Sequence, residues 1–326
     1  MDKVLVTGPD GFVGYRLCSR LIEEGFAVRG AQFSRLPLPE GCESIVVGDL
    51  AEAVNWDEAF DGVDRVIHLA ARVHVMNDES NDPLTAFRHV NADGTRAVAE
   101  AAVRAGVKRF VFVSTVKVHG EGTRDLPFHS DDSFAPEDPY GVSKMEAEQM
   151  LASLSVAGDL EVTAVRPPLV YGPGVRANFL RLLSAVNKGL PLPFGMIHNH
   201  RSLVGVNNLI DLLVCCLVHE KAGNEAFLVS DGRDLSTAEL VRAMAEALGC
   251  RPRLLPVPAV LMKLAGGLIG KRGEVDRLLG SLTVDISKNR ELLDWQPPVS
   301  IEQGLKETAE WFLNSATETT AHTKME

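Results

Sequence analysis

Short apolar runs alternate with amphipathic segments along the first half of the chain. The runs read VLVTG, FAVRGAQF, SIVVGDL, RVIHLAA, RFVFVST and LEVTAVRPP, and most of their positions are apolar. Between them, residues 12–24 and 83–105 repeat apolar side chains at helical spacing. Runs of this kind are typical of parallel strands that helices cover on both faces. The pattern therefore predicts an α/β fold built on a doubly wound parallel sheet.

The pattern changes after Arg166. Prolines 167, 168, 173, 191 and 193 interrupt the next segments, and helical patterns return at 236–248 and 301–313. We expect residues 1–168 and 202–231 to form the sheet domain. A smaller, mostly helical C-terminal substrate-binding domain should comprise residues 169–201 and 232–313.

Two later segments need separate interpretation. Residues 257–270 are apolar apart from Lys263, but they fall short of the roughly 20 residues that a membrane-spanning helix needs. We predict a core or dimer-facing helix there, with no stable membrane insertion. Residues 314–326 show no periodicity and predict a flexible tail.

Composition narrows the class of protein. The chain has 326 residues, 45% of them hydrophobic, and a formal net charge of −11. This charge and the lack of a Lys/Arg-rich block argue against nucleic-acid binding. The five cysteines follow no metal-ligand spacing, so we expect reduced thiols, no metal and a cytoplasmic protein. The chain starts with a predicted strand and shows no export signal.

A glycine pattern lies at the first predicted strand–helix junction. In VLVTGPDGFVG, Gly8 permits a tight turn, Gly11 lets the backbone approach a pyrophosphate, and Gly14 lets the helix pack close to the sheet. Phe12 and Val13 lie at the start of the helix, whose N-terminus favours an anion. The pattern predicts a Rossmann fold that binds NAD or NADP.

Residues after the second and third strands bear on the choice of cofactor. A carboxylate usually binds the adenosine ribose of NAD at the end of the second strand, and this chain has Gln32 there, followed by Arg35. Arg35 could pair with the 2′-phosphate of NADP or be a solvated loop residue. Asp49 is a candidate adenine contact, although a capping Asp would look the same.

Small residues follow the fourth strand. Ala70 and Ala71 would let the cofactor backbone pass, or they reflect tight packing alone. His74 follows them as a candidate substrate contact, although a lone loop histidine is more often structural.

The candidate reactive groups lie in the fifth strand and the helix after it. Asp138 and Pro139 are typical of a helix start, which puts Tyr140 and Lys144 on one face at i and i+4. Ionising a free tyrosine at pH 7 costs about 4 kcal/mol, so we expect the ammonium of Lys144 to lower the pKa of Tyr140. Thr115, at the end of the fifth strand, would orient a substrate oxygen while Tyr140 exchanges its proton.

These motifs together resemble the extended short-chain dehydrogenase/reductases, also called the NAD-dependent epimerase/dehydratase family. The resemblance runs from TGPDGFVG through HLAA, VFVST, YGVSK, RPPLVYGPG and RSLVGVNNL to LLDWQPPVSIEQGL. It implies that Thr115, Tyr140 and Lys144 form a catalytic triad. It further implies cofactor contacts at Gly8, Gly11, Phe12, Val13, Gly14, Gln32, Arg35, Asp49, Leu50, Leu69, Ala70, Ala71, Ser114, Tyr140, Lys144, Pro167 and Pro168.

The resemblance also implies a UDP-sugar substrate. Asn91 resembles the family's helix asparagine near the site, Asn178 a contact to the nucleotide diphosphate, and Arg201 a phosphate-binding arginine. Arg277 is a further candidate. An arginine grips a diphosphate through two N–H donors, which favours a nucleotide sugar over an apolar carbonyl compound.

Departures from the family narrow the reaction. Members that dehydrate sugars resemble one another in an Asp-Glu pair after the triad threonine, where this chain has Val116 and Lys117. Neither can act as that acid, so 4,6-dehydration is disfavoured. His119 replaces a usual tyrosine, and Gly205 and Asn207 replace a common aromatic residue and an aspartate.

What remains is oxidation or reduction at one sugar carbon. The segments LAARVHVM and VDRLLGSLTVDISK resemble reductases of UDP-4-keto-6-deoxy-N-acetylglucosamine, whose relatives are also labelled UDP-glucose 4-epimerase-like. Gln32 favours the 4-ketoreductase slightly over a 4-epimerase that retains NAD. A non-catalytic NAD(P) sensor is a hypothesis from another class. The family implies a homodimer through residues 85–105 and 141–154.

Overall fold

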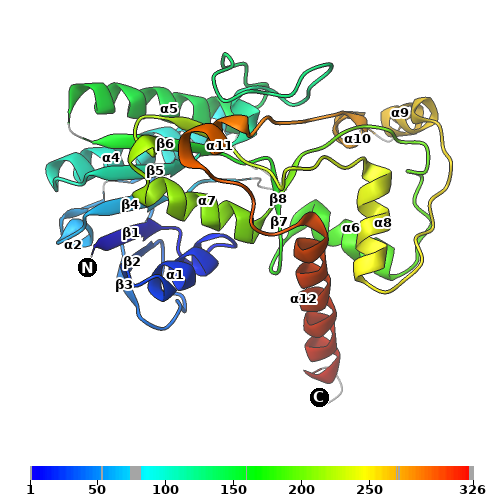
Figure 1. The fold of residues 1–326 in the computed structure, drawn as a ribbon, viewed down its shortest axis with the longest axis horizontal. Helices are drawn as coiled ribbons and strands as arrows, with labels where there is room; N and C mark the ends of the chain where they lie inside the picture. Colours follow the sequence, from blue (N-terminus) through cyan, green and yellow to red (C-terminus); the bar gives the residue numbers. More distant parts are fainter. Residues whose placement is uncertain are drawn as a thin grey trace.

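The computed structural model describes residues 2–52, 54–73, 82–158, 160–268, 270 and 272–322. Its centre is a seven-stranded parallel sheet in the order β3-β2-β1-β4-β5-β6-β9 (Figure 1). The strands are β1 (Lys3–Thr7), β2 (Ala27–Gln32), β3 (Cys42–Val46), β4 (Arg65–His68), β5 (Arg109–Val113), β6 (Glu161–Arg166) and β9 (Ala226–Leu228). This order confirms the predicted doubly wound Rossmann fold, with its switch point between β1 and β4.

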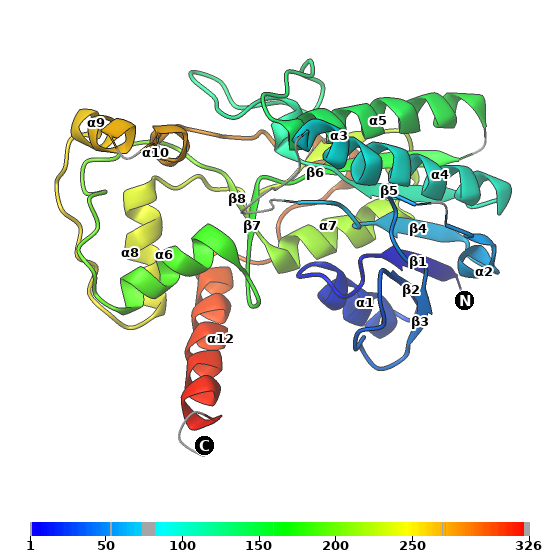
Figure 2. The same cartoon turned by 180° about the vertical axis from the view of Figure 1, so that it is seen from behind.

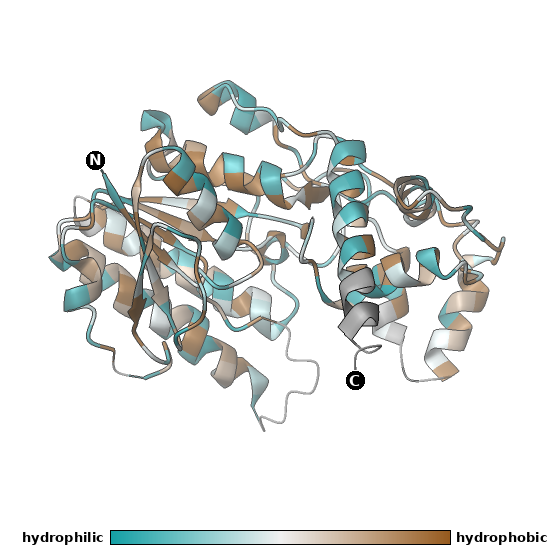
Figure 3. Ribbon diagram, turned by 90° about the horizontal axis from the view of Figure 1, so that it is seen from below, coloured by the Kyte–Doolittle hydropathy of each residue, from teal (hydrophilic) through white to brown (hydrophobic). Residues whose placement is uncertain are grey.

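Helices cover both faces of this sheet (Figures 1 and 2). One face packs against α1 (Gly14–Glu23), α7 (Val206–Val218) and α11 (Ser287–Leu293). The other packs against α2 (Asp57–Phe60), α4 (Gly94–Arg104) and α5 (Pro139–Ala157). In Figure 3 the strands are mostly brown and the outward helix faces mostly teal, as a sheet buried on both sides requires.

The sequence runs that predicted strands extend past the strand ends. β4 ends at His68 and β5 at Val113, so Leu69–Ala71 and Ser114–Thr115 leave the sheet at its carboxyl edge, where ligands bind in such folds. The three-residue strand β9 was not predicted, because so short a run carries no recognisable period.

A second, mostly helical part follows the sheet. It holds the two-stranded sheet of β7 (Leu169–Tyr171) and β8 (Leu203–Gly205). Around it pack α6 (Ala177–Asn187), α8 (Thr237–Ala247), α9 (Ala259–Leu268), α10 (Arg272–Leu279) and α12 (Ile301–His322), with a hydrophobic cluster of their own. The short elements are α3 (Pro83–Arg88), the π-helical turn η1 (His89–Asp93) and the 3₁₀ turns η2 (Val116–Val118) and η3 (Glu220–Ala222). The domain boundaries predicted above stay a proposal.

The C-terminal half differs from the expected structure in two details. The helix α12 continues to His322, past the expected end at residue 313, because extending a helix needs no new nucleation even without an apolar repeat. Of the two alternatives for α9, the core helix is wrong, since Val260, Leu261, Leu264 and Leu268 are exposed, and the dimer-facing helix stays a prediction. Within the described residues, no helix has the length and apolarity needed to cross a membrane.

Candidate active site

The three predicted catalytic residues gather at the carboxyl end of β5. Lys144 lies on α5 and is buried, with 1% of its surface exposed. Its Nζ donates a 2.8 Å hydrogen bond to the carbonyl of Val113, the last residue of β5, two residues before Thr115. Tyr140, one turn earlier on α5, is half-buried, and its ring meets Phe87 edge-on at 6.0 Å. The end of β5 and the first turns of α5 therefore bring Thr115, Tyr140 and Lys144 close together.

The start of α5 is held against the turn that carries Thr115. Asp138 caps α5 through a 2.6 Å hydrogen bond from the N–H of Gly141, and its other oxygen pairs with Lys117 Nζ at 2.6 Å. A Cβ at Gly141 would lie 2.9 Å from the carbonyl oxygen of Lys117, so only glycine permits this approach. Thr115 caps the same turn by accepting from Lys117 N. Lys117 thus positions the triad through Asp138.

The expected effect of Lys144 on Tyr140 is wrong for the cofactor-free protein. Burial raises the pKa of Tyr140, and the nearby carboxylate of Asp138 raises it further. Burial also lowers the pKa of Lys144 to about 7, partly offset by Glu148. The physical reason is that the ammonium is directed to Val113 O and lies 4.4 Å from the centre of the Phe112 ring. A neutral phenol is the resting state.

The amide of Asn91 is hydrogen-bonded inside the protein, beside the candidate site, and its predicted contact with a substrate stays a prediction. Its Nδ2 donates to the carbonyl of Arg72 and to Ser143 Oγ, each at 3.0 Å, and its Oδ1 accepts from Arg72 N. Asn91 is fully buried in the π-helical turn η1, an irregularity that is frequent at functional sites. It ties the loop after β4 to the residue beside Lys144 and is a positioning residue.

His68, which the sequence reasoning missed, stabilises the same edge of the sheet. It is buried at the end of β4, and its Nδ1 lies 2.7 Å from Thr7 Oγ1. That hydroxyl already accepts from the N–H groups of Leu69 and Ala70, so its own proton must go to Nδ1.

The other nitrogen of His68 therefore carries the proton. Nε2 lies 2.9 Å from Thr95 Oγ1, and Thr95 in turn donates to the carbonyl of Asn91. Burial, with a contribution from Lys144, lowers the pKa of His68 to about 3, so the ring is neutral and structural. A histidine inside an apolar strand run signals a buried polar group, but its partners Thr7 and Thr95 lie too far along the sequence to be recognised.

The glycine loop has the predicted geometry. Gly8 adopts φ +67°, and a Cβ at Gly14 would lie 2.0 Å from the carbonyl oxygen of Gly8. The helix α1 begins at Gly14 with no side-chain cap from Val13, which leaves its N-terminus for an anion. Phe12 packs into the clusters of both parts of the chain.

Other predicted cofactor residues surround this loop, and they fit a dinucleotide. Ser114 is buried, and among the described residues its hydroxyl has no hydrogen-bond partner, as expected of a group kept for a ligand. The backbone of Ala70 lies 3.2 Å from where a Cβ of Gly8 would be. Leu69 and Ala71 are half-buried beside it, and Pro167 and Pro168 are buried beyond β6. The N-terminus of α1 would hold the pyrophosphate and the β5 end the nicotinamide.

The side-chain amide of Gln32 is hydrogen-bonded inside the protein, and its contact with the cofactor stays a prediction. Gln32 is fully buried, with Nε2 donating to Leu36 O at 3.0 Å and Oε1 accepting from Ser44 Oγ at 2.8 Å. The side chain is turned into the β2–β3 connection because these partners satisfy its amide. Arg35 is exposed in the loop that follows.

Asp49 and Leu50 lie beyond β3. Asp49 is exposed, and its Oδ1 accepts from Ala51 N, so the carboxylate caps a turn. Leu50 packs where Gly94 of α4 leaves room, since a Cβ on Gly94 would lie 2.9 Å from it. An adenine contact by these two residues stays a prediction.

The predicted substrate residues divide into two groups. Arg201 Nη1 donates to the carbonyls of Arg277 and Gly280 at the end of α10, and Arg277 lies 4.0 Å from Glu121. Burial lowers the pKa of Arg201. Glu121 also pairs with Lys117 Nζ at 2.7 Å, so these charges connect to the triad.

Asn178 is exposed on the first turn of α6, away from any hydrogen bond described here, and His74 lies outside the described residues. Among the described residues, no cluster of three or more His, Cys, Asp or Glu could hold a metal ion.

The chain is similar to known proteins over most of its length. The profile of the NAD dependent epimerase/dehydratase family matches residues 4–230. A UDP-glucose 4-epimerase of Vibrio cholerae is 47% identical over 316 residues, or 96% of each chain. An N-acetyl-alpha-D-glucosaminyl-diphospho-ditrans,octacis-undecaprenol 4-epimerase of Escherichia coli O157:H7 is 30% identical over 81% of this chain and 78% of its own.

The fold comparison agrees. The structure of MoeE5 in complex with UDP-glucose and NAD superposes with a TM-score of 0.77 and 28% identity, covering 96% of this chain and 99% of that one. With the triad at the end of β5 and the glycine loop at the start of α1, these matches show that the chain belongs to the NAD dependent epimerase/dehydratase family.

Proposed function

We propose that this enzyme is a UDP-hexose 4-epimerase that works with a retained NAD and accepts UDP-glucose or its N-acetylamino counterpart. The observation that carries the proposal is the 47% identity to the Vibrio cholerae enzyme across 96% of both chains, over which the triad is intact. The chain has no acid pair after Thr115, which disfavours dehydration of the sugar and so supports the proposal. Lys117, at that place, forms ion pairs with Asp138 and Glu121.

The side chains have separate tasks in this reaction. Tyr140, neutral at rest, first releases its own proton to solvent as the charged Lys144 stabilises the phenolate. The phenolate then takes the proton of the substrate's O4 and gives it back after the sugar has turned over. Thr115 orients O4, and Lys144 holds the cofactor's ribose and stabilises the phenolate once its ammonium is recharged. A bound NAD supplies the reversible hydride acceptor at C4. The reaction has no net redox change, so no second substrate is needed.

The diphosphate of the substrate is proposed to lie between the two parts of the chain. Arg201 and Arg277 are the proposed contacts, and both already lie beside the carboxylate of Glu121, which an incoming diphosphate would displace. Asn178 is a further proposed contact from α6. The MoeE5 structure was obtained with UDP-glucose, which supports a UDP-sugar here.

A 4-ketoreductase is the second candidate. The amide of Gln32 is bound to Leu36 and Ser44, so the end of β2 offers no carboxylate to grip the adenosine ribose. That favours an exchangeable cofactor, NAD or NADP, and hence single-direction reduction. A non-catalytic sensor is disfavoured by the intact Tyr140 and Lys144.

Two further features are proposals. The helix pair α4 and α5 is the proposed homodimer surface. The five cysteines are free, which supports a reducing compartment and hence the cytoplasm.

The 4-epimerase and the 4-ketoreductase differ in whether they need added cofactor. Purified enzyme should convert UDP-glucose to UDP-galactose with no added cofactor, and its heat-denatured supernatant should contain NAD. NADH or NADPH consumption that depends on a UDP-4-keto sugar, without such conversion, would establish the reductase instead. If the wild-type protein shows neither activity, the proposal is wrong.

A further inference from the structure

The helix α9 points its apolar side chains at solvent. Val260, Leu261, Leu264 and Leu268 are 67%, 55%, 61% and 89% exposed. Residues 260, 264 and 268 follow one another at four-residue spacing, and Leu261 lies beside them, so they form one face. The buried residues of the helix are Met262 and Gly266, which lie on the opposite face. The helix therefore packs on the rest of the protein through the face that carries Met262 and Gly266.

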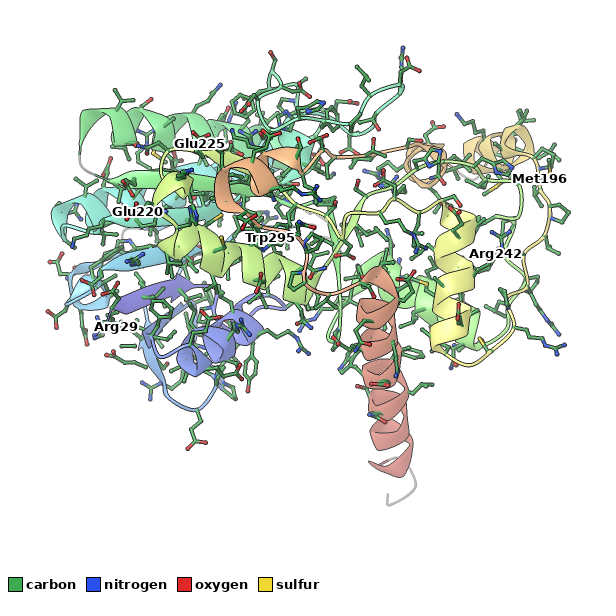
Figure 4. All side chains as sticks on the ribbon, viewed as in Figure 1. Arg29, Met196, Glu220, Glu225, Arg242 and Trp295 are labelled. Carbon is green, nitrogen blue, oxygen red and sulfur yellow. The ribbon has the colours of Figure 1, made fainter. Side chains whose placement is uncertain are left out.

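Two further apolar side chains are exposed on the segments near α9. Leu255 is 46% and Met196 47% exposed, and Gly195 N donates to Leu255 O, so the two segments run side by side. Figure 1 shows α9 at the end of the molecule remote from the main sheet, and Figure 4 places Met196 at the same end. Isolated exposed leucines are ordinary, but four exposed apolar residues on one face of a helix indicate a binding surface.

The segment that leads into α9 is basic although the protein is acidic. Residues 249–263 contain three Lys/Arg and no Asp/Glu, whereas the whole chain carries a formal net charge of −11. Arg251 and Arg253 are exposed in this segment.

We propose that α9 and the loop around Met196 bind the surface of a bilayer that contains anionic phospholipid. An exposed apolar helix face flanked by basic residues is the pattern of a helix that lies in the membrane interface, and Arg251 and Arg253 supply the positive charge that a negative surface attracts. Such binding requires no spanning helix, in agreement with the length of α9.

A second copy of the chain is the less suitable occupant. A two-fold contact places the same surface on both sides, so a dimer through α9 would bring two basic segments together. An anionic bilayer can bury the apolar face of α9 and attract the basic residues beside it. Because α9 packs on α10, with Lys263 and Asp276 3.2 Å apart, and α10 is capped by Arg201, the binding surface adjoins the candidate substrate site.

Flotation with lipid vesicles tests this proposal. The full chain should bind vesicles of phosphatidylcholine with 30% phosphatidylglycerol, bind pure phosphatidylcholine vesicles roughly 10-fold more weakly, and dissociate as salt is raised from about 0.1 to 0.5 M. The double variant Leu264→Gln, Leu268→Gln should lose about 10-fold in binding to the anionic vesicles.

Matched variants make the result specific. Leu126→Gln with Val156→Gln changes two exposed apolar residues elsewhere and should leave binding unchanged. Arg251→Ser with Arg253→Ser should weaken binding to anionic vesicles alone. All variants should keep wild-type turnover of soluble UDP-glucose, which separates this proposal from the epimerase assignment.

Three outcomes would overturn the proposal. The first is that the wild type does not float with anionic vesicles at low salt. The second is that the Leu264/Leu268 variant floats as well as the wild type. The third is that vesicles bind neither protein, while sedimentation shows self-association of the wild type that the variant lacks. The last would assign the face to a second copy.

Discussion

The ammonium of Lys144 lies 2.8 Å from the carbonyl oxygen of Val113, and this hydrogen bond joins the reactive helix α5 to the strand end that carries Thr115. The same side chain is buried against the face of Phe112. Because burial lowers the pKa of this lysine to about 7, its side chain is only partly charged at neutral pH. The sugar and the dinucleotide are proposed to recharge it on binding.

This burial predicts a pH dependence of stability. The pKa of Lys144 is about 7 in the folded protein against 10.5 for an ordinary lysine, so the unfolded chain binds more protons between these values. The free energy of unfolding should therefore rise with pH in that window, by at most about 1.4 kcal/mol per unit. Lys144→Met removes this dependence.

Urea unfolding of cofactor-free protein at pH 7 and pH 9 measures it. The stability of the Lys144→Met variant relative to wild type should be greatest at pH 7 and should shrink at pH 9. Lys108→Met, at an exposed position, is the control and should show no such change. An equal difference at both pH values for Lys144→Met would contradict the prediction.

Gly14→Ala should abolish cofactor retention. The added Cβ would lie 2.0 Å from the carbonyl oxygen of Gly8, so the loop must move away from the start of α1. We expect NAD content after purification to fall at least roughly 10-fold. Gly267→Ala, whose Cβ would meet nothing within 4 Å, should keep it. Full NAD content in Gly14→Ala protein would show that the loop does not hold the pyrophosphate.

Asn91→Ala should reduce stability and turnover together. It leaves the N–H and C=O of Arg72 without their amide partner, a loss of about 1–3 kcal/mol in the free energy of unfolding. Turnover should fall while the KM for UDP-glucose changes little, because the residue positions Ser143 and the triad but does not contact the sugar. The exposed Asn187→Ala is the control. A selective rise in KM would restore Asn91 as a substrate contact.

Tyr140→Phe should lower kcat by about 10²- to 10⁴-fold, because the variant lacks the group that exchanges the O4 proton. NAD content and the circular dichroism spectrum should match wild type, since the ring still packs against Phe87. Initial rates of UDP-galactose formation give the comparison. Wild-type turnover in this variant would remove Tyr140 from the reaction.

The fold and the position of the triad could be predicted from sequence for a physical reason. Parallel strands end at one edge of the sheet, so Gly8, Ala70 and Thr115 had to come together once the strands were recognised. Glycines that a Cβ would exclude, such as Gly14, are also evident from spacing.

Side-chain partners could not be predicted in this way. Gln32 turns to Leu36 and Ser44, and Asn91 to Arg72 and Ser143, because folding brings acceptors and donors to them that no local pattern reveals. The pKa of Tyr140 depends likewise on where the ammonium of Lys144 points. The Thr7–His68–Thr95 chain was missed for the same reason.

Isotope transfer tests the central claim most directly. UDP-glucose with deuterium at C4 is converted by the enzyme without added cofactor, and the product is analysed by mass spectrometry and NMR. The account predicts UDP-galactose that retains deuterium at C4, because the hydrogen removed from that carbon returns to it within one active site. Loss of the deuterium to solvent or to added NADH, or no UDP-galactose at all, would contradict it.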